Sequence, residues 1–195
     1  MAVHEVTFPI TDPNEILKLR AGDEVTVQGH IIGIRDRTQV RIFDQGVPPP
    51  MDLTGAFLLH TAPNVRKLEN GRYEKLCIGT TTSARMVRFT EPLGTQYGVR
   101  AICGKGGFPD DAIEPMHALG MVYFAIVGGA AALETTQIEE IEDVQWEDLM
   151  PECLWKFRVR NFGPLIVAMD TRGRSLYEEV KEAAGARLQE LVRRL

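Results

Sequence analysis

The stretch Gly79-Thr80-Thr81-Thr82-Ser83-Ala84-Arg85-Met86 places four hydroxyl residues behind a glycine, with an arginine shortly after them. Threonine and serine are unfavourable inside helices but favourable where a helix begins, because their side-chain oxygens accept hydrogen bonds from free backbone N–H groups. A helix that begins here would place Thr81 at its start and Arg85 one turn further along the same face. Since the N–H groups of a helix start attract anions, the stretch predicts an anion-binding site. The plainer interpretation is a turn or a helix cap.

A second stretch, Ile102-Cys103-Gly104-Lys105-Gly106-Gly107, is expected to complete this site. Its glycines let the backbone approach a ligand closely, while the Lys105 ammonium supplies positive charge. The alternative is an ordinary surface loop. A nucleotide P-loop is excluded, because Gly98 lies one residue too far from Gly104 and Gly106 stands where a magnesium-binding Ser or Thr is required.

Length and composition indicate an ordinary globular protein, and we expect one domain over residues 1–195. Apolar residues make up 44% and charged residues 25% of the chain, and the net charge of -5 argues against a nucleic-acid or anionic-membrane partner. Neither a membrane-spanning run nor a secretory signal is visible, which favours a cytoplasmic location. Cys77, Cys103 and Cys153 are odd in number and widely separated, so we expect reduced, mostly buried thiols.

Hydrophobic patterning predicts a mixed α/β fold with at least six short strands. The acidic stretch 137–143 is interpreted as a solvated face in preference to a metal site. Gly29 is expected to break or bend its strand, and Arg35 falls at that strand's end, where open α/β sheets commonly bind ligands. We expect a hairpin turn at Asn70-Gly71, and helices after Pro13, after Asp110 or Asp111, and after a Ser175 capping box. The last helix carries an apolar stripe at Val180, Ala184, Leu188, Leu191 and Leu195. Strands or apolar runs are expected over 3–10, 24–34, 56–60, 75–78, 99–103, 121–127, 157–159 and 165–169.

Five motifs occur in the same order as in the β region of the iron–sulfur hydro-lyases of the class I fumarase and tartrate dehydratase family. Stretch 79–86 resembles the family signature Gly-Pro-Thr-Thr-Ser-x-Arg-Met. Each motif alone is weak, but five in sequence are specific, and the chain is identified as a member from about Gly22 to Leu176. The other four motifs are Arg35-Asp36 after a Gly-Ile strand end, Gly104-Lys-Gly-Gly107, Gly128-Gly-Ala-Ala-Ala-Leu133 and Pro151-Glu-Cys-Leu-Trp155.

The resemblance implies a swivelling β/β/α domain, a mixed sheet with flanking helices, like the mobile domain of aconitase. It implies a hydro-lyase that reversibly adds water to a small dicarboxylate, such as fumarate to malate in the tricarboxylic acid cycle. It also implies a [4Fe-4S] cluster with one iron that acts as a Lewis acid. In heteromeric members the cluster cysteines belong to a separate α subunit, and the cysteines here lack clustered spacing. The chain therefore resembles a β subunit, active only with its α subunit in an α2β2 heterotetramer.

Carried over residue by residue, the resemblance implies that Arg35, Arg85 and Lys105 bind the substrate carboxylates and that Thr81 occupies the proton-transfer position. A dianion needs two or three cations, and the planar fork of arginine matches a carboxylate. A threonine hydroxyl is a weak base that needs an activating neighbour, which we expect on the α subunit. The alternatives are a salt bridge from Arg35 to Asp36 and a helix-face charge at Arg85.

Three positions depart from the family pattern: Gln39 replaces a usual histidine, Thr80 a proline, and Val87 an acidic residue. Stretches 150–155 and 162–167 look closer to tartrate dehydratase β subunits than to fumarases, although we expect both to lie away from the carboxylate-binding residues. Fumarate, tartrate and a methyl-substituted dicarboxylate remain open as substrates. An inactive dicarboxylate-binding or regulatory paralogue is a further alternative, against which the four intact site residues argue.

Overall fold

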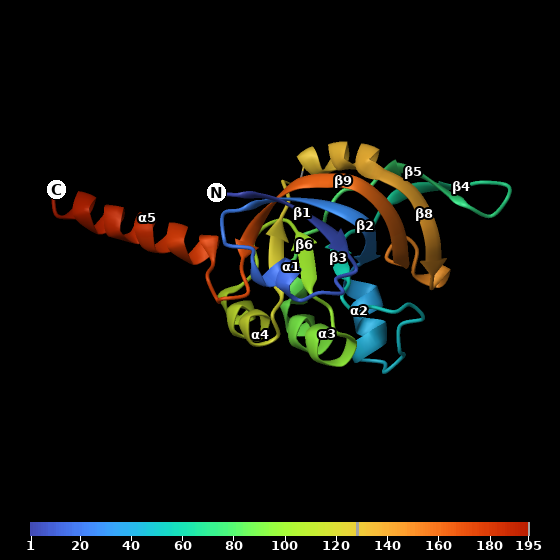
Figure 1. Ribbon diagram of the computed structural model, residues 1–195, viewed down its shortest axis with the longest axis horizontal. Coiled ribbons are helices and arrows are strands. Elements are labelled where there is room, and N and C mark those ends of the chain that lie inside the picture. Colours follow the sequence, from blue (N-terminus) through green and yellow to red (C-terminus); the bar gives the residue numbers. More distant parts are fainter. Residues whose placement is uncertain (128, 195) are drawn as a thin grey trace.

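The computed structural model describes residues 1–127 and 129–194. Gly128, which begins one of the family motifs, and Leu195, which ends the expected apolar stripe, lie outside the described residues. The elements confirm a mixed α/β fold with flanking helices (Figure 1). They are the strands β1 (Val3–Phe8), β2 (Glu24–Ile34), β3 (Phe57–His60), β4 (Asn64–Lys67), β5 (Tyr73–Cys77), β6 (Ala101–Gly104), β7 (Val122–Ala125), β8 (Ile138–Gln145) and β9 (Leu154–Met169), the α-helices α1 (Asn14–Leu17), α2 (Asp36–Phe43), α3 (Thr90–Tyr97), α4 (Ile113–Ala118) and α5 (Leu176–Val192), and the 3₁₀ helices η1 (Ala84–Phe89), η2 (Asp110–Ala112), η3 (Ala130–Gln137) and η4 (Glu147–Leu149).

The main sheet has seven strands in the order β1-β2-β3-β6-β7-β9-β8. Strands β1, β2, β3, β6 and β7 pair in parallel, whereas β9 runs antiparallel to β7, β8 and β2. Because β9 pairs with both β7 and β2, the strands β2, β3, β6, β7 and β9 form a closed loop of pairings. Since β1, β2, β3, β6 and β7 are parallel, their carboxyl ends lie at the same edge of the sheet, where loops can form a site.

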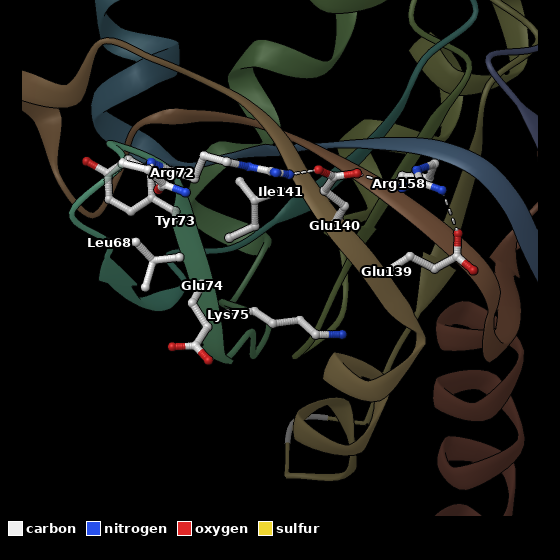
Figure 2. A pocket seen from close by; sticks show the side chains of 10 residues that line it. Leu68, Arg72, Tyr73, Glu74, Lys75, Glu139, Glu140, Ile141 and Arg158 are labelled. Carbon is white, nitrogen blue, oxygen red and sulfur yellow. Dashed lines mark hydrogen bonds and ion pairs between the residues drawn. The ribbon is translucent and has the colours of Figure 1, made fainter.

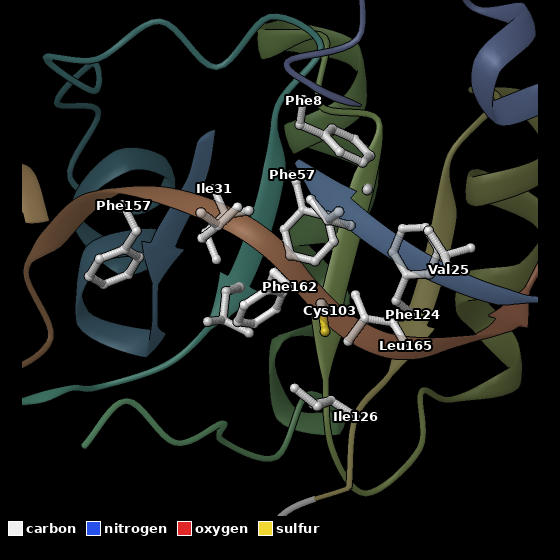
Figure 3. Packing of buried hydrophobic residues seen from close by; sticks show 14 of the residues in the cluster. Phe8, Val25, Ile31, Phe57, Cys103, Phe124, Ile126, Phe157, Phe162 and Leu165 are labelled. Atoms are coloured by element: carbon white, nitrogen blue, oxygen red, sulfur yellow. The ribbon is translucent and has the colours of Figure 1, made fainter. Parts of the chain in front are cut away.

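Alternating side chains of these strands enter two different cores, as the pleat requires. Phe57 and Phe124 stack inside the curved sheet with ring centroids 5.6 Å apart, and Phe162 from β9 packs edge-on against Phe57 (Figure 3). Leu58 and Tyr123 point to the other side, where helices α3 and α4 cover the sheet. Both sides of the central parallel strands are thus buried, and loops remain the available place for chemistry.

One expectation about strands needs correction. Residues 157–159 and 165–169 belong to one continuous strand, β9, which reaches across the molecule and bends at Asn161 and Gly163, both with positive φ. The acidic stretch 137–143 lies mostly on edge strand β8, where its carboxylates pair with Arg158 and Arg160 of β9. Cross-strand charge pairing explains this acidic composition, and no carboxylate cluster suited to a metal occurs among the described residues.

Helix α5 extends away from the rest of the molecule (Figure 1). The expected apolar stripe is present, but Val180, Leu188 and Leu191 are 69%, 62% and 59% exposed. The capping box expected at Ser175 does not form, because its hydroxyl makes no capping hydrogen bond. No helix in the described part of the chain is long and apolar enough to span a membrane.

Candidate functional site

The four expected site residues lie at the edge formed by the carboxyl ends of the parallel strands. Arg35 directly follows β2, and Lys105 directly follows β6. The loop that carries Thr81 crosses this edge between the two, held by backbone hydrogen bonds from Thr81 N to the His60 carbonyl (2.7 Å) and from Lys105 N to the Thr81 carbonyl (3.2 Å). The expectation that a strand end presents Arg35 is confirmed.

The threonine-rich stretch does not begin a helix at Thr81, and this expectation was wrong. Thr80 and Thr82 form isolated bridges with Thr61 and Lys105, so the stretch is extended, and the 3₁₀ helix η1 begins only at Ala84. The hydroxyl of Thr80 donates to the His60 carbonyl instead of capping a helix. Backbone pairing with two strand ends outweighs the local preference of hydroxyl residues for a helix start.

Arg85 contacts both Asp36 and Thr81. Its guanidinium donates to both oxygens of the Asp36 carboxylate, from Nε and Nη2 at 2.9 Å each, and Nη2 also lies 3.3 Å from the Thr81 hydroxyl. Burial alone would raise the pKa of Asp36, but the hydrogen bonds and charge of Arg85, with the charge of Arg35, hold that pKa below its ordinary value. Asp36 is therefore an ionised anchor that fixes the orientation of the Arg85 fork.

Arg35 pairs with the same anchor and with a second carboxylate. Its Nε lies 3.3 Å from Asp36 and 3.7 Å from Glu152. Glu152 also accepts a hydrogen bond from the backbone N–H of Arg37 at 2.9 Å. The stretch 150–155 was expected to lie away from the carboxylate-binding residues, and this was wrong: β8 and β9 return its glutamate to the start of α2. Glu152 was not predicted as a site residue, because its motif carried a family resemblance but no signal of spatial proximity.

Lys105 is half-buried and makes no ion pair or side-chain hydrogen bond within residues 1–127 and 129–194. Positive φ at Gly106 and Gly107 turns the chain immediately after it. Arg35 and Arg85 each have further guanidinium N–H groups that do not contact Asp36, Glu152 or Thr81. These N–H groups likewise have no partner in the described structure. The arrangement can bind a carboxylate or similar anion with donors whose orientation is already fixed.

The three family departures lie in or beneath this edge. Gln39 is fully buried, and its amide nitrogen lies 3.0 Å from the Met86 sulfur. It therefore fills space under Arg35 and η1 and does not face the ligand side. Thr80 is buried against β3, and Val87 is a half-buried residue of η1 that packs against the core. These positions support the site loops from below.

The cysteines do not form an iron–sulfur site. Cys77 is exposed, whereas Cys103 on β6 and Cys153 just before β9 are buried. No group of three metal-ligating side chains occurs in the part of the chain that is described. The residues of this chain therefore do not fit the role of cluster ligands, and the chemistry below uses only its other side chains.

One hollow in the surface lies away from this edge. A cavity of about 390 Å³ separates the β4–β5 hairpin from β8 (Figure 2). Its arginines are already neutralised, since Arg72 pairs with Glu140, and Arg158 pairs with Glu139 and Glu140. None of the four expected site residues lines it. Its charges are balanced within the cavity, so it is a poorer candidate for binding a dianion than the edge that carries Arg85 and Lys105.

Comparison with known proteins identifies relatives along almost the whole chain. The family described as "Fumarase C-terminus" matches residues 3–180. The putative L(+)-tartrate dehydratase subunit beta of Methanocaldococcus jannaschii is 36% identical over 193 residues, which cover 96% of this chain and 98% of that protein. The L(+)-tartrate dehydratase subunit beta of Escherichia coli (strain K12) is 38% identical over 192 residues, which cover 96% and 92%. The putative fumarate hydratase class I of Geobacillus stearothermophilus is 33% identical over 183 residues, which cover 93% of this chain and 35% of that protein.

Proposed function

This chain belongs to the family of the fumarase C-terminus, and from that membership we propose that it is the β subunit of a hydro-lyase that reversibly adds water to a small dicarboxylate. The observation that carries the proposal is the cation group at the strand edge. Arg85 joins Asp36 to Thr81, and Lys105 stands on the adjoining loop without a partner in the described structure. A dicarboxylate carries two negative charges, and this edge has three cations against the two carboxylates of Asp36 and Glu152, with Lys105 in neither pair.

In the proposed reaction, Arg35, Arg85 and Lys105 bind the substrate carboxylates. Asp36 and Glu152 orient the arginines and leave their remaining N–H groups for the substrate. When the carbon next to a carboxylate loses its proton, negative charge spreads onto that carboxylate. Cations whose positions are already fixed stabilise this charge without further reorganisation.

Thr81 is proposed to carry the proton. Its oxygen accepts a hydrogen bond from Arg85 at 3.3 Å, so the guanidinium stabilises the ionised form of the hydroxyl. This contact partly supplies the activation that a threonine needs. The described residues offer its own proton no acceptor, and we propose that the remaining partner is on the α subunit.

The α subunit is also proposed to hold the [4Fe-4S] cluster, since the cysteines of this chain do not form a cluster site. When bound, the cluster would supply a Lewis acid for the leaving hydroxyl. The printed names of the relatives as beta subunits support a partner chain. We propose an α2β2 assembly in the cytoplasm, in which neither subunit alone contains the whole site.

For the substrate, two relatives whose lengths match this chain are named tartrate dehydratase subunits, which favours L-tartrate over fumarate. A methyl-substituted dicarboxylate is the next candidate. The experiment is anaerobic co-expression with an α-type partner and a panel of L-tartrate, fumarate, malate and methylfumarate. Turnover of one or more supports the proposal, and the preferred substrate is the one with the highest kcat/KM. A folded complex that binds a dicarboxylate but turns over none would instead indicate the inactive, regulatory paralogue.

A further inference from the structure

Three buried polar side chains lie beneath the site edge and have no role in the proposed reaction. They are His60 at the end of β3, Tyr123 on β7, and Ser83 from the threonine-rich loop, each at most 1% exposed. The Ser83 oxygen lies 2.9 Å from His60 Nδ1 and 3.0 Å from the Tyr123 hydroxyl. One serine therefore connects two strands that are separated by β6.

The protonation states follow from burial. Burial lowers the pKa of His60 to about 3, so its imidazole is neutral at physiological pH. Burial also raises the pKa of Tyr123, so its phenol keeps its proton and donates it to Ser83. The serine oxygen can accept a second hydrogen bond as well as donate one, so the tautomer of the neutral imidazole decides the direction of the contact with His60 Nδ1. Ser83 thus links the Tyr123 phenol to a neutral His60 imidazole whose Nε2 has no partner among the described residues.

Ser83 is located where the two site-bearing loops meet. Its backbone N–H donates to the Lys105 carbonyl at 3.1 Å, while Lys105 N–H donates to the Thr81 carbonyl at 3.2 Å. A Cβ added at Gly104 would lie 1.9 Å from the Ser83 oxygen, so the hydroxyl occupies space that only a glycine leaves free. A change in the position of Ser83 would therefore be transmitted to both Thr81 and Lys105.

We propose that the hydrogen-bonded chain Tyr123–Ser83–His60 is a positioning device that holds Thr81, which transfers the proton, and Lys105, which binds a carboxylate, in fixed relative positions. The three side chains do not touch the substrate, and their action is through the loop above them. This role rests on the proposed hydro-lyase function. An apolar set of similar volume would stabilise the fold about as well, because a buried polar network must first overcome desolvation. The hydroxyl groups differ from apolar groups in one respect: their hydrogen bonds have a preferred geometry, so they fix the position of the loop, whereas contacts between methyl groups do not.

The test uses the complete complex with its α-type partner and two variants, Ser83→Ala and Tyr123→Phe, which remove single hydroxyl groups. A displacement of about 1 Å can lower a rate about a hundredfold. We therefore expect Ser83→Ala to lower kcat by about 10- to 100-fold with KM changed less than about threefold. Tyr123→Phe should have a smaller effect, and the double variant should be no slower than Ser83→Ala alone, because Tyr123 acts only through Ser83.

Tyr177→Phe is the matched control, since the Tyr177 ring lies 6.4 Å from Tyr123 and its hydroxyl is outside the network. Melting curves verify that each variant is folded. Folded Ser83→Ala and Tyr123→Phe complexes with kcat within about twofold of the wild type would overturn the proposal, with twofold corresponding to well under 1 kcal/mol. So would losses that multiply in the double variant, because independent structural effects are additive in free energy.

Nitrogen NMR of the His60 imidazole tests the hydrogen-bonded chain independently of enzyme activity, so a failure of this proposal can be distinguished from a failure of the proposed function. The wild-type chain should show one neutral tautomer at every pH from about 5 to 9, since this range lies well above the strongly lowered pKa of His60. Ser83→Ala should shift the Nδ1 signal. An imidazole that titrates near its ordinary pKa would overturn the network whatever the enzyme does. If the His60 imidazole stays neutral over this pH range but the complex has no turnover, the proposed function is overturned, and the positioning role with it.

Discussion

Replacing Thr81 by valine tests the proposed proton transfer most directly. Valine keeps the shape and volume of threonine and removes only the hydroxyl. That hydroxyl has one described hydrogen bond, the 3.3 Å contact from Arg85, which is long. Its loss should lower the free energy of unfolding by less than about 1 kcal/mol, which corresponds to a melting temperature lower by about 2–4 °C at most for a chain of this size.

Catalysis should respond very differently from stability. Loss of a general acid–base group lowers kcat by about 10²- to 10⁴-fold. Arg35, Arg85 and Lys105 would still bind the carboxylates, so the Kd of the dicarboxylate should change little. The assay combines anaerobic turnover of the complex, calorimetric measurement of the Kd, and a melting curve, all on one preparation.

Thr82→Val is the matched control, because Thr82 is the next residue of the same loop, is also half-buried, and makes no side-chain hydrogen bond in the described structure. It should melt and turn over like the wild type. A folded Thr81→Val complex with wild-type kcat would refute the catalytic assignment. Equal losses of kcat in both variants would refute it as well, because the effect would then belong to the loop as a whole.

Three further predictions concern other parts of the chain. Arg85→Ala and Lys105→Ala should each lower kcat/KM by about a hundredfold or more while circular dichroism remains unchanged, and near-normal kinetics would remove that residue from the site. The chain without its α partner should not turn over a dicarboxylate, and substantial activity of the isolated chain would contradict the half-site arrangement. Burial raises the pKa of Glu134 from 4.5 to about 7. The folded state therefore binds that proton more tightly, and stability should fall by up to about 3 kcal/mol as pH rises from about 4.5 to 7. Urea midpoints at both ends of this range should show the fall in the wild type and a smaller one in Glu134→Gln.

The sequence predicted the position of the site because strand ends can be recognised locally. Arg35 after a Gly-Ile strand and Lys105 among glycines both lie where the pattern indicated. Thr81 and Arg85 do approach each other, but the expected reason was wrong, since backbone pairing with β3 and β6 replaces a helix turn. A spacing of four residues predicted proximity correctly without predicting the conformation that produces it.

The rest depended on contacts between residues distant in sequence. Glu152 reaches Arg35 only because β8 and β9 return to the start of α2. The two stretches expected as separate strands in 157–169 are one strand, because pairing with β2 and β8 supports the backbone through the break in their apolar pattern. Pairing across a sheet leaves no signal in local periodicity, so neither feature was accessible from the sequence alone.

The projecting helix α5 has a consequence for local stability. Its first two turns are anchored by Tyr177 near Tyr123 and by the ion pair from Lys181 to Asp110, but the later turns have no tertiary cover within the described residues. Isolated helices of this length are marginal in water, and Gly185 lowers helix stability by a further ~1 kcal/mol relative to alanine. Amide protons after Gly185 should therefore exchange with deuterium far faster than those of β6 and β7. In the isolated chain, a protease should cleave this helix first and leave the sheet and its site-bearing loops intact.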